Sequence, residues 1–160
     1  MGFWGCKVAY VEYSYLDGER VRHGFLDLGR SAIVTATNET GFRIGPAVRG
    51  GGNGVVFSAA LVDEKGNDVA PCAVKFLRRM DTRSRVDRFA NEARIMKSLG
   101  HDAIARFFGQ GAVRDPQTGI DVPWLAMTLG GANMREFVKG WEFSLAEFKT
   151  IALDAIRAVE

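Results

Sequence analysis

A glycine-rich run in the first half of the chain could bring backbone amides close to phosphate groups. Residues 49–54 read Arg-Gly-Gly-Gly-Asn-Gly and lie between two stretches expected to be strands, Phe42 to Val48 and Val55 to Val62. Glycines lack a Cβ, so a turn of this kind lets N–H groups approach phosphate oxygens closely. On its own the run is equally typical of a flexible hairpin tip. Because it does not open a helix, and because no Gly-Lys-Ser/Thr follows, it fits neither a Rossmann fingerprint nor a Walker A loop.

A lysine and a glutamate further along the chain could supply a charge pair beside that loop. Lys75 lies in the apolar run Cys72 to Leu77, where a half-buried ammonium is costly unless it meets an anion. Glu92 lies in the segment Ser84 to Leu99, whose apolar residues recur at helical spacing, and it borders that apolar stripe. The lysine alone could equally well face solvent, and a single helix glutamate is more often solvated. The order of loop, lysine and glutamate is the more specific signal, and it predicts that the helix brings Glu92 to Lys75.

Strands are expected to position most of these groups. Turn residues at Asp17-Gly18, around Gly66 and from Asp115 to Gly119 separate stretches rich in apolar and β-branched residues. The expected strands are Val8 to Leu16, Arg20 to Leu28, Ala32 to Thr37, Phe42 to Val48, Val55 to Val62, Val69 to Leu77, Ala105 to Val113 and Trp124 to Leu129.

The motifs and their order resemble those of the protein kinase family. The signature G-x-G-x-x-G-x-V aligns with Arg49, Gly51, Gly54 and Val56, and V-A-I-K aligns with Cys72 to Lys75. Glu92 takes the place of the helix glutamate that pairs with that lysine. His101 to Ile104 resembles the segment after this helix, and Leu125 to Gly131 resembles the strand that runs into the hinge. The resemblance covers about Phe42 to Glu160, the small lobe and the first helices after the hinge.

The resemblance implies a binding site for ATP. The glycine-rich turn would cover the phosphates, Lys75 would hold the α- and β-phosphates, and Glu92 would position Lys75, so Lys75 and Glu92 are the implied catalytic residues. Val56 and Ala73 would contact the adenine ring and Met127 would be the gatekeeper. The residues implied to bind ATP are Arg49, Gly50, Gly51, Gly52, Asn53, Gly54, Val56, Ala73, Lys75, Met127, Thr128 and Gly130, with Thr128 and Gly130 acting through their backbone.

The sequence departs from the family pattern in two ways. Arg49 stands where the first glycine of the loop is usual. No H-R-D-x-x-x-x-N is present and no D-F-G follows the hinge, so the sequence lacks the motifs that supply the base and the magnesium ligands. Asp27-Leu28-Gly29 resembles D-F-G, but it precedes the glycine-rich loop and is not expected to bind a metal.

These observations imply the ATP-binding part of a protein kinase, a transferase that phosphorylates protein Ser/Thr or Tyr when it is complete. This chain alone is expected to be inactive, with Mg²⁺ bound only in a complete kinase and no metal site of its own. One alternative is a non-catalytic, pseudokinase-like module that binds nucleotide. Another is a protein-interaction module built on the N-terminal strands.

The predicted fold class is α+β: a kinase-like small lobe with a five-stranded antiparallel sheet, one helix of the αC type, extra N-terminal strands and one or two C-terminal helices. Residues 1–40 are expected to be a β extension, residues 41–130 the small lobe, and residues 131–160 the start of a truncated large lobe. A short helix is expected near Asn133 to Lys139 and a longer one from the capping box Ser144 to Glu147. The apolar face of this last helix predicts a large-lobe partner or self-association. Its residues are Leu145, Phe148, Ala152, Ala155, Ile156 and Val159.

Composition argues against several other classes of protein. The net charge is +2 and the basic residues are scattered, which gives no support to a nucleic acid or a membrane surface as partner. No apolar stretch approaches the roughly 20 residues that span a bilayer. Two cysteines, Cys6 and Cys72, do not make a disulfide framework, and the first residues do not form a signal peptide. We therefore expect a cytoplasmic protein whose partners are ATP and, in the complete enzyme, a protein substrate.

Overall fold

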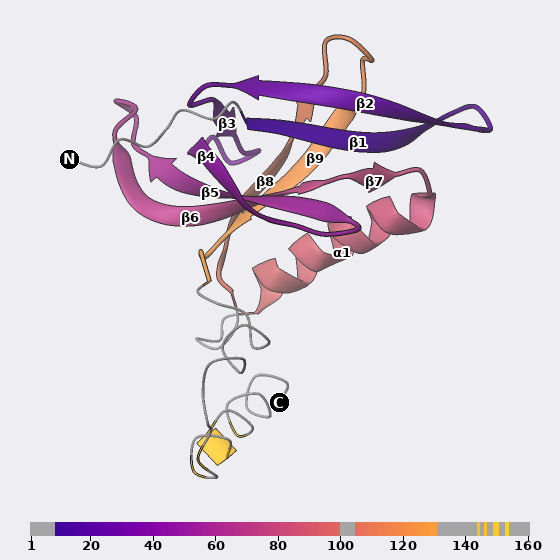
Figure 1. The fold of residues 1–160 in the computed structure, drawn as a ribbon. Coiled ribbons are helices and arrows are strands. Elements are labelled where there is room, and N and C mark those ends of the chain that lie inside the picture. Colours follow the sequence, from indigo (N-terminus) through magenta and orange to yellow (C-terminus); the bar gives the residue numbers. More distant parts are fainter. Residues whose placement is uncertain are drawn as a thin grey trace.

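A six-stranded antiparallel sheet organises the part of the chain that the structure describes (Figure 1). The computed structural model describes residues 9–99 and 105–130, together with residues 144, 146, 149, 150 and 153. Every neighbouring pair of strands in the sheet is antiparallel. In spatial order the strands are β3 (Ile33–Thr35), β4 (Gly41–Gly50), β5 (Gly54–Val62), β6 (Asp68–Leu77), β9 (Asp121–Met127) and β8 (Phe107–Arg114).

A smaller three-stranded sheet contains the N-terminal hairpin. Its strands β1 (Ala9–Asp17) and β2 (Arg20–Gly29) are antiparallel, and the two-residue strand β7 (Arg79–Met80) runs parallel to β1. Asp17 pairs with Arg20, so the hairpin turn has Gly18 and Glu19 at its centre, one residue later than predicted. Gly18 has a φ of 62°, and a positive φ at the first central position is what a type II′ hairpin turn needs.

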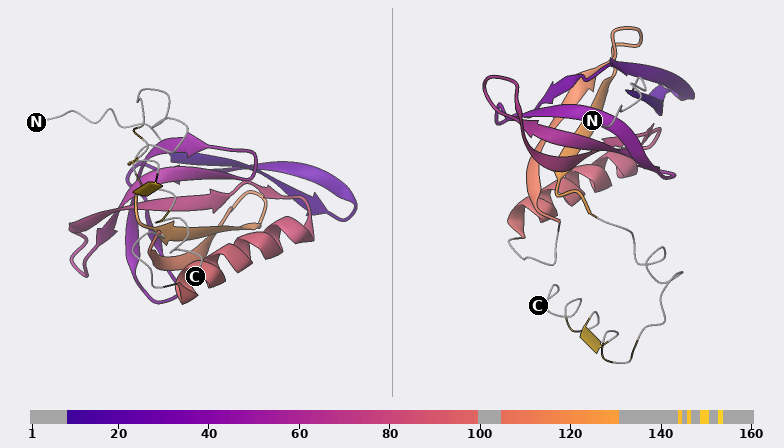
Figure 2. Two further views of the ribbon diagram at one scale, coloured as in Figure 1. Left: turned by 90° about the horizontal axis from the view of Figure 1, so that it is seen from below. Right: turned by 60° about the vertical axis from the view of Figure 1, so that its left-hand side comes forward.

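Different elements pack on the two faces of the large sheet. The helix α1 (Arg83–Ser98) packs on one face, and the β1–β2 hairpin packs on the other (Figures 1 and 2). Successive side chains of a strand point to opposite faces, and β6 shows this division. Leu77 contacts the helix residues Phe89 and Ala93, whereas Val74 and Phe76 join the core beneath the hairpin.

The N-terminal strands share their core with the kinase-like strands. Val11 and Leu26 of the hairpin are at most 2% exposed and belong to the same apolar cluster as Phe42, Phe76 and Trp124 of the large sheet. The N-terminal strands therefore pack as an addition to the large sheet and do not form a core of their own among the described residues. The sheet has six strands where five were expected, because β3 from the N-terminal segment pairs with β4.

A buried polar cluster fixes the hairpin to the turn between β8 and β9. Tyr13 on β1 and Asp115 at the end of β8 are each 1% exposed. The Tyr13 hydroxyl donates to Asp115 Oδ2 at 2.6 Å and lies 2.5 Å from Thr118 Oγ1. Asp115 also accepts hydrogen bonds from the Gln117 N–H at 2.9 Å and from Thr118 Oγ1 at 3.1 Å. The carboxylate is therefore satisfied although it is buried, as buried polar groups generally must be.

The predicted elements that fall on described residues are present, with small shifts at their ends. The helix predicted from Ser84 to Leu99 is α1, and its N-cap is Thr82. Residues 146, 149, 150 and 153 of the expected terminal helix are helical. The segment His101 to Ile104, the short helix near Asn133 to Lys139 and the rest of the terminal helix lie outside the described residues. No helix in the described part of the chain combines the length and the apolar character that a membrane crossing requires.

Candidate functional site

Lys75 and Glu92 form an ion pair beneath the large sheet. The Lys75 Nζ donates to both carboxylate oxygens of Glu92, at 2.6 Å and 2.8 Å. The same Nζ lies 5.8 Å from the centre of the Phe89 ring. The side chains of Lys75 and Glu92 are 25% and 38% exposed, so the pair lies at the edge of the core and is reachable from solvent. The structure thus brings together the two charged residues that the sequence order indicated.

Packing of α1 explains why this pair forms. Phe89 and Ala93 are buried against Leu77 and Leu125, which anchors the middle of the helix to the sheet. Glu92 precedes Ala93, so it lies at the border of the buried stripe, within reach of a side chain that rises from β6. A lysine here with no anion would face a costly partial burial, and Glu92 removes that cost.

The residues implied to contact adenine share a face with Lys75. Val56 on β5 is paired with Lys75, and Ala73 is paired with Met127 on β9. Directly paired residues in neighbouring strands point to the same side of a sheet. Arg49 is paired with Val56 and so belongs to this side as well. Ala73 is 2% exposed, whereas Val56 and Met127 are half-buried, so the face carries accessible apolar surface next to the Lys75 ammonium.

The glycine-rich loop forms the tip of the β4–β5 hairpin. The Gly51 N–H donates to the Gly54 carbonyl at 2.9 Å, which closes the turn around Gly52 and Asn53. A Cβ placed at Gly54 would lie 3.3 Å from Lys75 Cε and 2.9 Å from the Phe76 carbonyl oxygen, so this glycine allows the loop to lie against the lysine stem. A Cβ at Gly50 or Gly52 would meet nothing within 4 Å, so the loop offers open space there.

The residue directly after β9, Thr128, uses its backbone N–H within the sheet but not its carbonyl. The Thr128 N–H donates to the Arg106 carbonyl at 2.9 Å, and Thr128 Oγ1 accepts from the Arg106 N–H at 3.0 Å. Of the two backbone groups of Thr128, the carbonyl is therefore the one that could face a ligand. Gly130 is exposed. Thr128 follows Met127 directly and Gly130 lies two residues further on, next to the point where Met127 pairs with Ala73.

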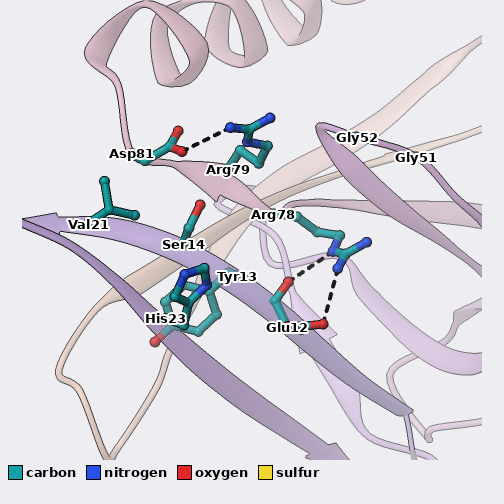
Figure 3. A pocket seen from close by; sticks show the side chains of 10 residues that line it. All are labelled: Glu12, Tyr13, Ser14, Val21, His23, Gly51, Gly52, Arg78, Arg79 and Asp81. Atoms are coloured by element: carbon teal, nitrogen blue, oxygen red, sulfur yellow. Dashed lines mark hydrogen bonds and ion pairs between the residues drawn. The ribbon is translucent and has the colours of Figure 1, made fainter.

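Two cavities lie on the other side of the sheet from Lys75. One has a volume of about 560 Å³ and lies between the hairpin and the glycine-rich loop (Figure 3). It is lined by Glu12, Tyr13, Ser14, Val21, His23, Gly51, Gly52, Arg78, Arg79 and Asp81. The other, of about 430 Å³, is lined by apolar residues of β1, β4 and β5 together with Glu12 and Arg78. Gly51 and Gly52 of the predicted site thus also border a space that sequence reasoning did not indicate.

Sequence reasoning also missed four residues that connect the hairpin to the rest of the molecule in two pairs. Glu12 pairs with Arg78, and Tyr13 is bonded to Asp115. The sequence indicates only a turn at Asp115, and no local pattern shows that a tyrosine far away in the chain reaches it. The one signal in the sequence is Arg78, which comes directly after the apolar run of β6. Its guanidinium needs an acceptor, but the sequence does not show which residue supplies it.

The described residues contain no group of three or more His, Cys, Asp or Glu side chains that could hold a metal ion. The features that are present fit an organic phosphate better than a metal. They are an ammonium held by one carboxylate, a glycine-rich turn and an adjoining apolar face.

Sheet, loop and ion pair together define a small lobe of the protein kinase type. A family model described as protein tyrosine and serine/threonine kinase matches residues 42–142, and the chain belongs to this family. The match begins at β4, so the β1–β2 hairpin and β3 precede it. A search among curated proteins found no match to the chain.

Proposed function

We propose that the helix-covered face of the large sheet binds ATP and that the chain is the ATP-binding part of a protein kinase. The observation that carries this proposal is the contact of Lys75 Nζ with both carboxylate oxygens of Glu92. An ammonium has three N–H donors, so two are used by Glu92 and the third is left for a phosphate oxygen. Glu92 thereby holds the ammonium in one place rather than letting it move freely on its flexible stem.

The other residues of this face would complete the site. Backbone amides of Gly50 to Gly54 would approach the phosphates, and the open space at Gly50 and Gly52 supports such an approach. Val56, Ala73 and Met127 would hold the adenine ring by apolar contact. The carbonyl of Thr128 and the backbone of Gly130 would bond the polar edge of the base. Mg²⁺ would accompany ATP in a complete kinase, and since the described residues offer no cluster to hold it, we assign no metal ligand.

Replacing Lys75 with alanine is expected to weaken ATP binding about tenfold or more. A hydrogen bond to a charged group is worth roughly 1.5–3 kcal/mol, and about 1.4 kcal/mol corresponds to a factor of ten. Glu92→Gln should weaken binding less, because it loosens the lysine without removing it. We would titrate the ¹⁵N-labelled chain with Mg·ATP up to millimolar concentration and follow the amide signals by NMR.

The matched control for this experiment is Lys65→Ala. Lys65 is exposed in the turn between β5 and β6, at the opposite end of these strands from the glycine-rich loop, and its removal changes net charge by the same amount. Binding should be unchanged in this variant. Equal losses in Lys75→Ala and Lys65→Ala, or no signal changes near Lys75 in the wild type, would contradict the proposed site.

The chain alone is expected not to transfer phosphate from ATP. Transfer requires a positioned base and metal ions, and the H-R-D and D-F-G motifs that supply them do not occur after the hinge in this sequence. The measurement is incubation of the purified chain with labelled ATP, Mg²⁺ and generic protein substrates, followed by detection of labelled protein. Turnover at rates of 1–100 per second, the range usual for kinases, would show that other residues of this chain perform the chemistry.

A further inference from the structure

Arg78 contacts both the glycine-rich loop and the N-terminal hairpin. It stands between β6 and β7, directly after the residue that pairs with Gly54. Its N–H donates to the Asn53 carbonyl at 2.9 Å, and its own carbonyl accepts the Ser14 N–H at 2.7 Å. One backbone unit therefore joins the tip of the glycine-rich loop to strand β1.

The Arg78 side chain adds a second connection to the same strand. Its Nε donates to the Glu12 carbonyl at 3.0 Å, and its Nη2 lies 3.3 Å from Glu12 Oε2 (Figure 3). The two side chains are 33% and 60% exposed, so the ion pair itself is weakened by solvent. The bond to the carbonyl differs, because its acceptor is fixed in a strand and the planar guanidinium can hold both contacts at once.

Strand β1, which Arg78 contacts, is itself held in place by a buried hydrogen bond. Glu12, Tyr13 and Ser14 are consecutive, and Tyr13 makes the buried bond to Asp115. On the loop side, by contrast, a Cβ at Gly50 or Gly52 would meet nothing within 4 Å, and at Gly51 only the Gly54 carbonyl oxygen at 3.9 Å. The loop therefore has a rigid neighbour behind it and open space around it, and Arg78 joins the two.

We propose that Arg78 is a positioning residue that couples the β1–β2 hairpin to the glycine-rich loop. Arg78 fixes the position of the loop tip relative to Lys75, because its backbone N–H binds the Asn53 carbonyl and its guanidinium binds Glu12. The hairpin precedes the residues that match the kinase family, so this control of the loop is an addition to the matched domain. The consequence for phosphate contacts rests on the proposed ATP site, whereas the coupling itself concerns only the protein.

Hydrogen exchange of the full chain, without nucleotide, tests the coupling. In Arg78→Met the stem is kept and the guanidinium is lost. The amides of Gly51 and Arg78, which donate to Gly54 and Asn53, should then exchange about fivefold faster, the effect of roughly 1 kcal/mol. Arg78→Lys should restore only part of the effect, because a single ammonium lacks the planar fork whose separate nitrogens reach the Glu12 carbonyl and carboxylate. Glu12→Gln should have a smaller effect, because the bond to the Glu12 carbonyl remains.

The matched control is Arg79→Met at the neighbouring position. Arg79 also borders the 560 Å³ cavity, but its side chain pairs with Asp81 instead of the hairpin. Loop exchange should stay at the wild-type rate in this variant. If the two arginine variants accelerate loop exchange equally, or if neither does, Arg78 has no positioning role. If Arg78→Met unfolds the chain, the same comparison is made between Glu12→Gln and Arg79→Met.

A comparison of ligands then separates this inference from the proposed ATP site. Arg78→Met should weaken ATP binding but leave adenosine binding unchanged, because the loop covers phosphates only. Equal weakening of both ligands would contradict a role at the phosphates. If the wild type binds neither ligand, the proposed ATP site is wrong, and the exchange result alone still decides whether Arg78 positions the loop.

Discussion

Replacing Asp115 with alanine is expected to lower the free energy of unfolding by roughly 3 kcal/mol or more. Hydrogen bonds to a charged group are worth about 1.5–3 kcal/mol each, and Asp115 accepts from the Tyr13 hydroxyl, the Gln117 N–H and the Thr118 hydroxyl. Removal of the carboxylate leaves the Tyr13 hydroxyl buried with Thr118 as its remaining neighbour. Urea denaturation followed by circular dichroism would measure the change. Asp121, an exposed residue that pairs with Arg114, is the control position, and Asp121→Ala should cost less than about 1 kcal/mol.

The same cluster makes stability depend on pH at both ends of the range. Burial alone would raise the pKa of Asp115, but the hydrogen bonds from Tyr13, Gln117 and Thr118 outweigh it and hold the pKa below its usual range. A depressed pKa contributes stability that is present above the unfolded value of about 4 and is lost as pH falls through the folded value. Asp115→Asn should therefore be less sensitive to acid than the wild type. An unchanged acid dependence in this variant would mean that Asp115 is not among the groups that set it.

At high pH, Tyr13 should make stability fall as pH rises, whereas Asp115 makes it fall as pH drops. Burial and, next, the hydrogen bond to Asp115 raise the pKa of Tyr13 to about 12. A raised pKa contributes stability that is fully present below the unfolded value of about 10 and is lost as pH rises through the folded value. Tyr13→Phe lacks this titration, so its stability should fall less steeply than that of the wild type between about pH 10 and 12.

The elements of the kinase-like part could be predicted because their signals are local. The strands are apolar stretches bounded by turn residues, and the helix carries an apolar stripe that places Glu92 at its border. Since only the two-residue strand β7 separates β6 from α1 along the chain, the short connection leaves few ways for the helix to pack. The contact of Glu92 with Lys75 followed from these local facts together with the cost of an unpaired lysine in an apolar strand.

The placement of the first forty residues could not be predicted, because it depends on pairings between distant segments. The hairpin can be predicted from the sequence. The alternation of apolar and polar residues along its strands, however, does not indicate which surface its apolar side packs against. Tyr13, with its hydroxyl, gives no sign that it will be 1% exposed, and Asp115 has the same pattern as any turn aspartate. The parallel pairing of β1 with β7 involves only Ser14 with Arg79 and Tyr15 with Met80, too short a strand to be recognised from propensity.

Gly24 shows how closely the hairpin is fitted to Tyr13. The two residues are paired across β1 and β2, and the aromatic ring lies over the glycine, an arrangement that protects a glycine within a sheet. A Cβ at Gly24 would lie 2.2 Å from Tyr13 Cζ and 2.4 Å from its hydroxyl oxygen, distances that no real contact reaches. The Tyr13 ring is fixed by its bonds to Asp115 and Thr118, so it cannot move aside without losing them.

Gly24→Ala is therefore expected to destabilise the chain by roughly 3 kcal/mol or more, the sum of an overpacked core and lost buried hydrogen bonds. Gly52→Ala is the matched control, because a Cβ there meets nothing within 4 Å, and its effect should stay within about 0.5 kcal/mol. In a Tyr13→Ala background the clash has no partner, so adding Gly24→Ala should cost less than about 1 kcal/mol. Denaturation of the two single variants and the double variant gives the coupling between the sites. An equal cost of Gly24→Ala in both backgrounds would show that the ring does not require the glycine, and that the hairpin is held in place by other contacts.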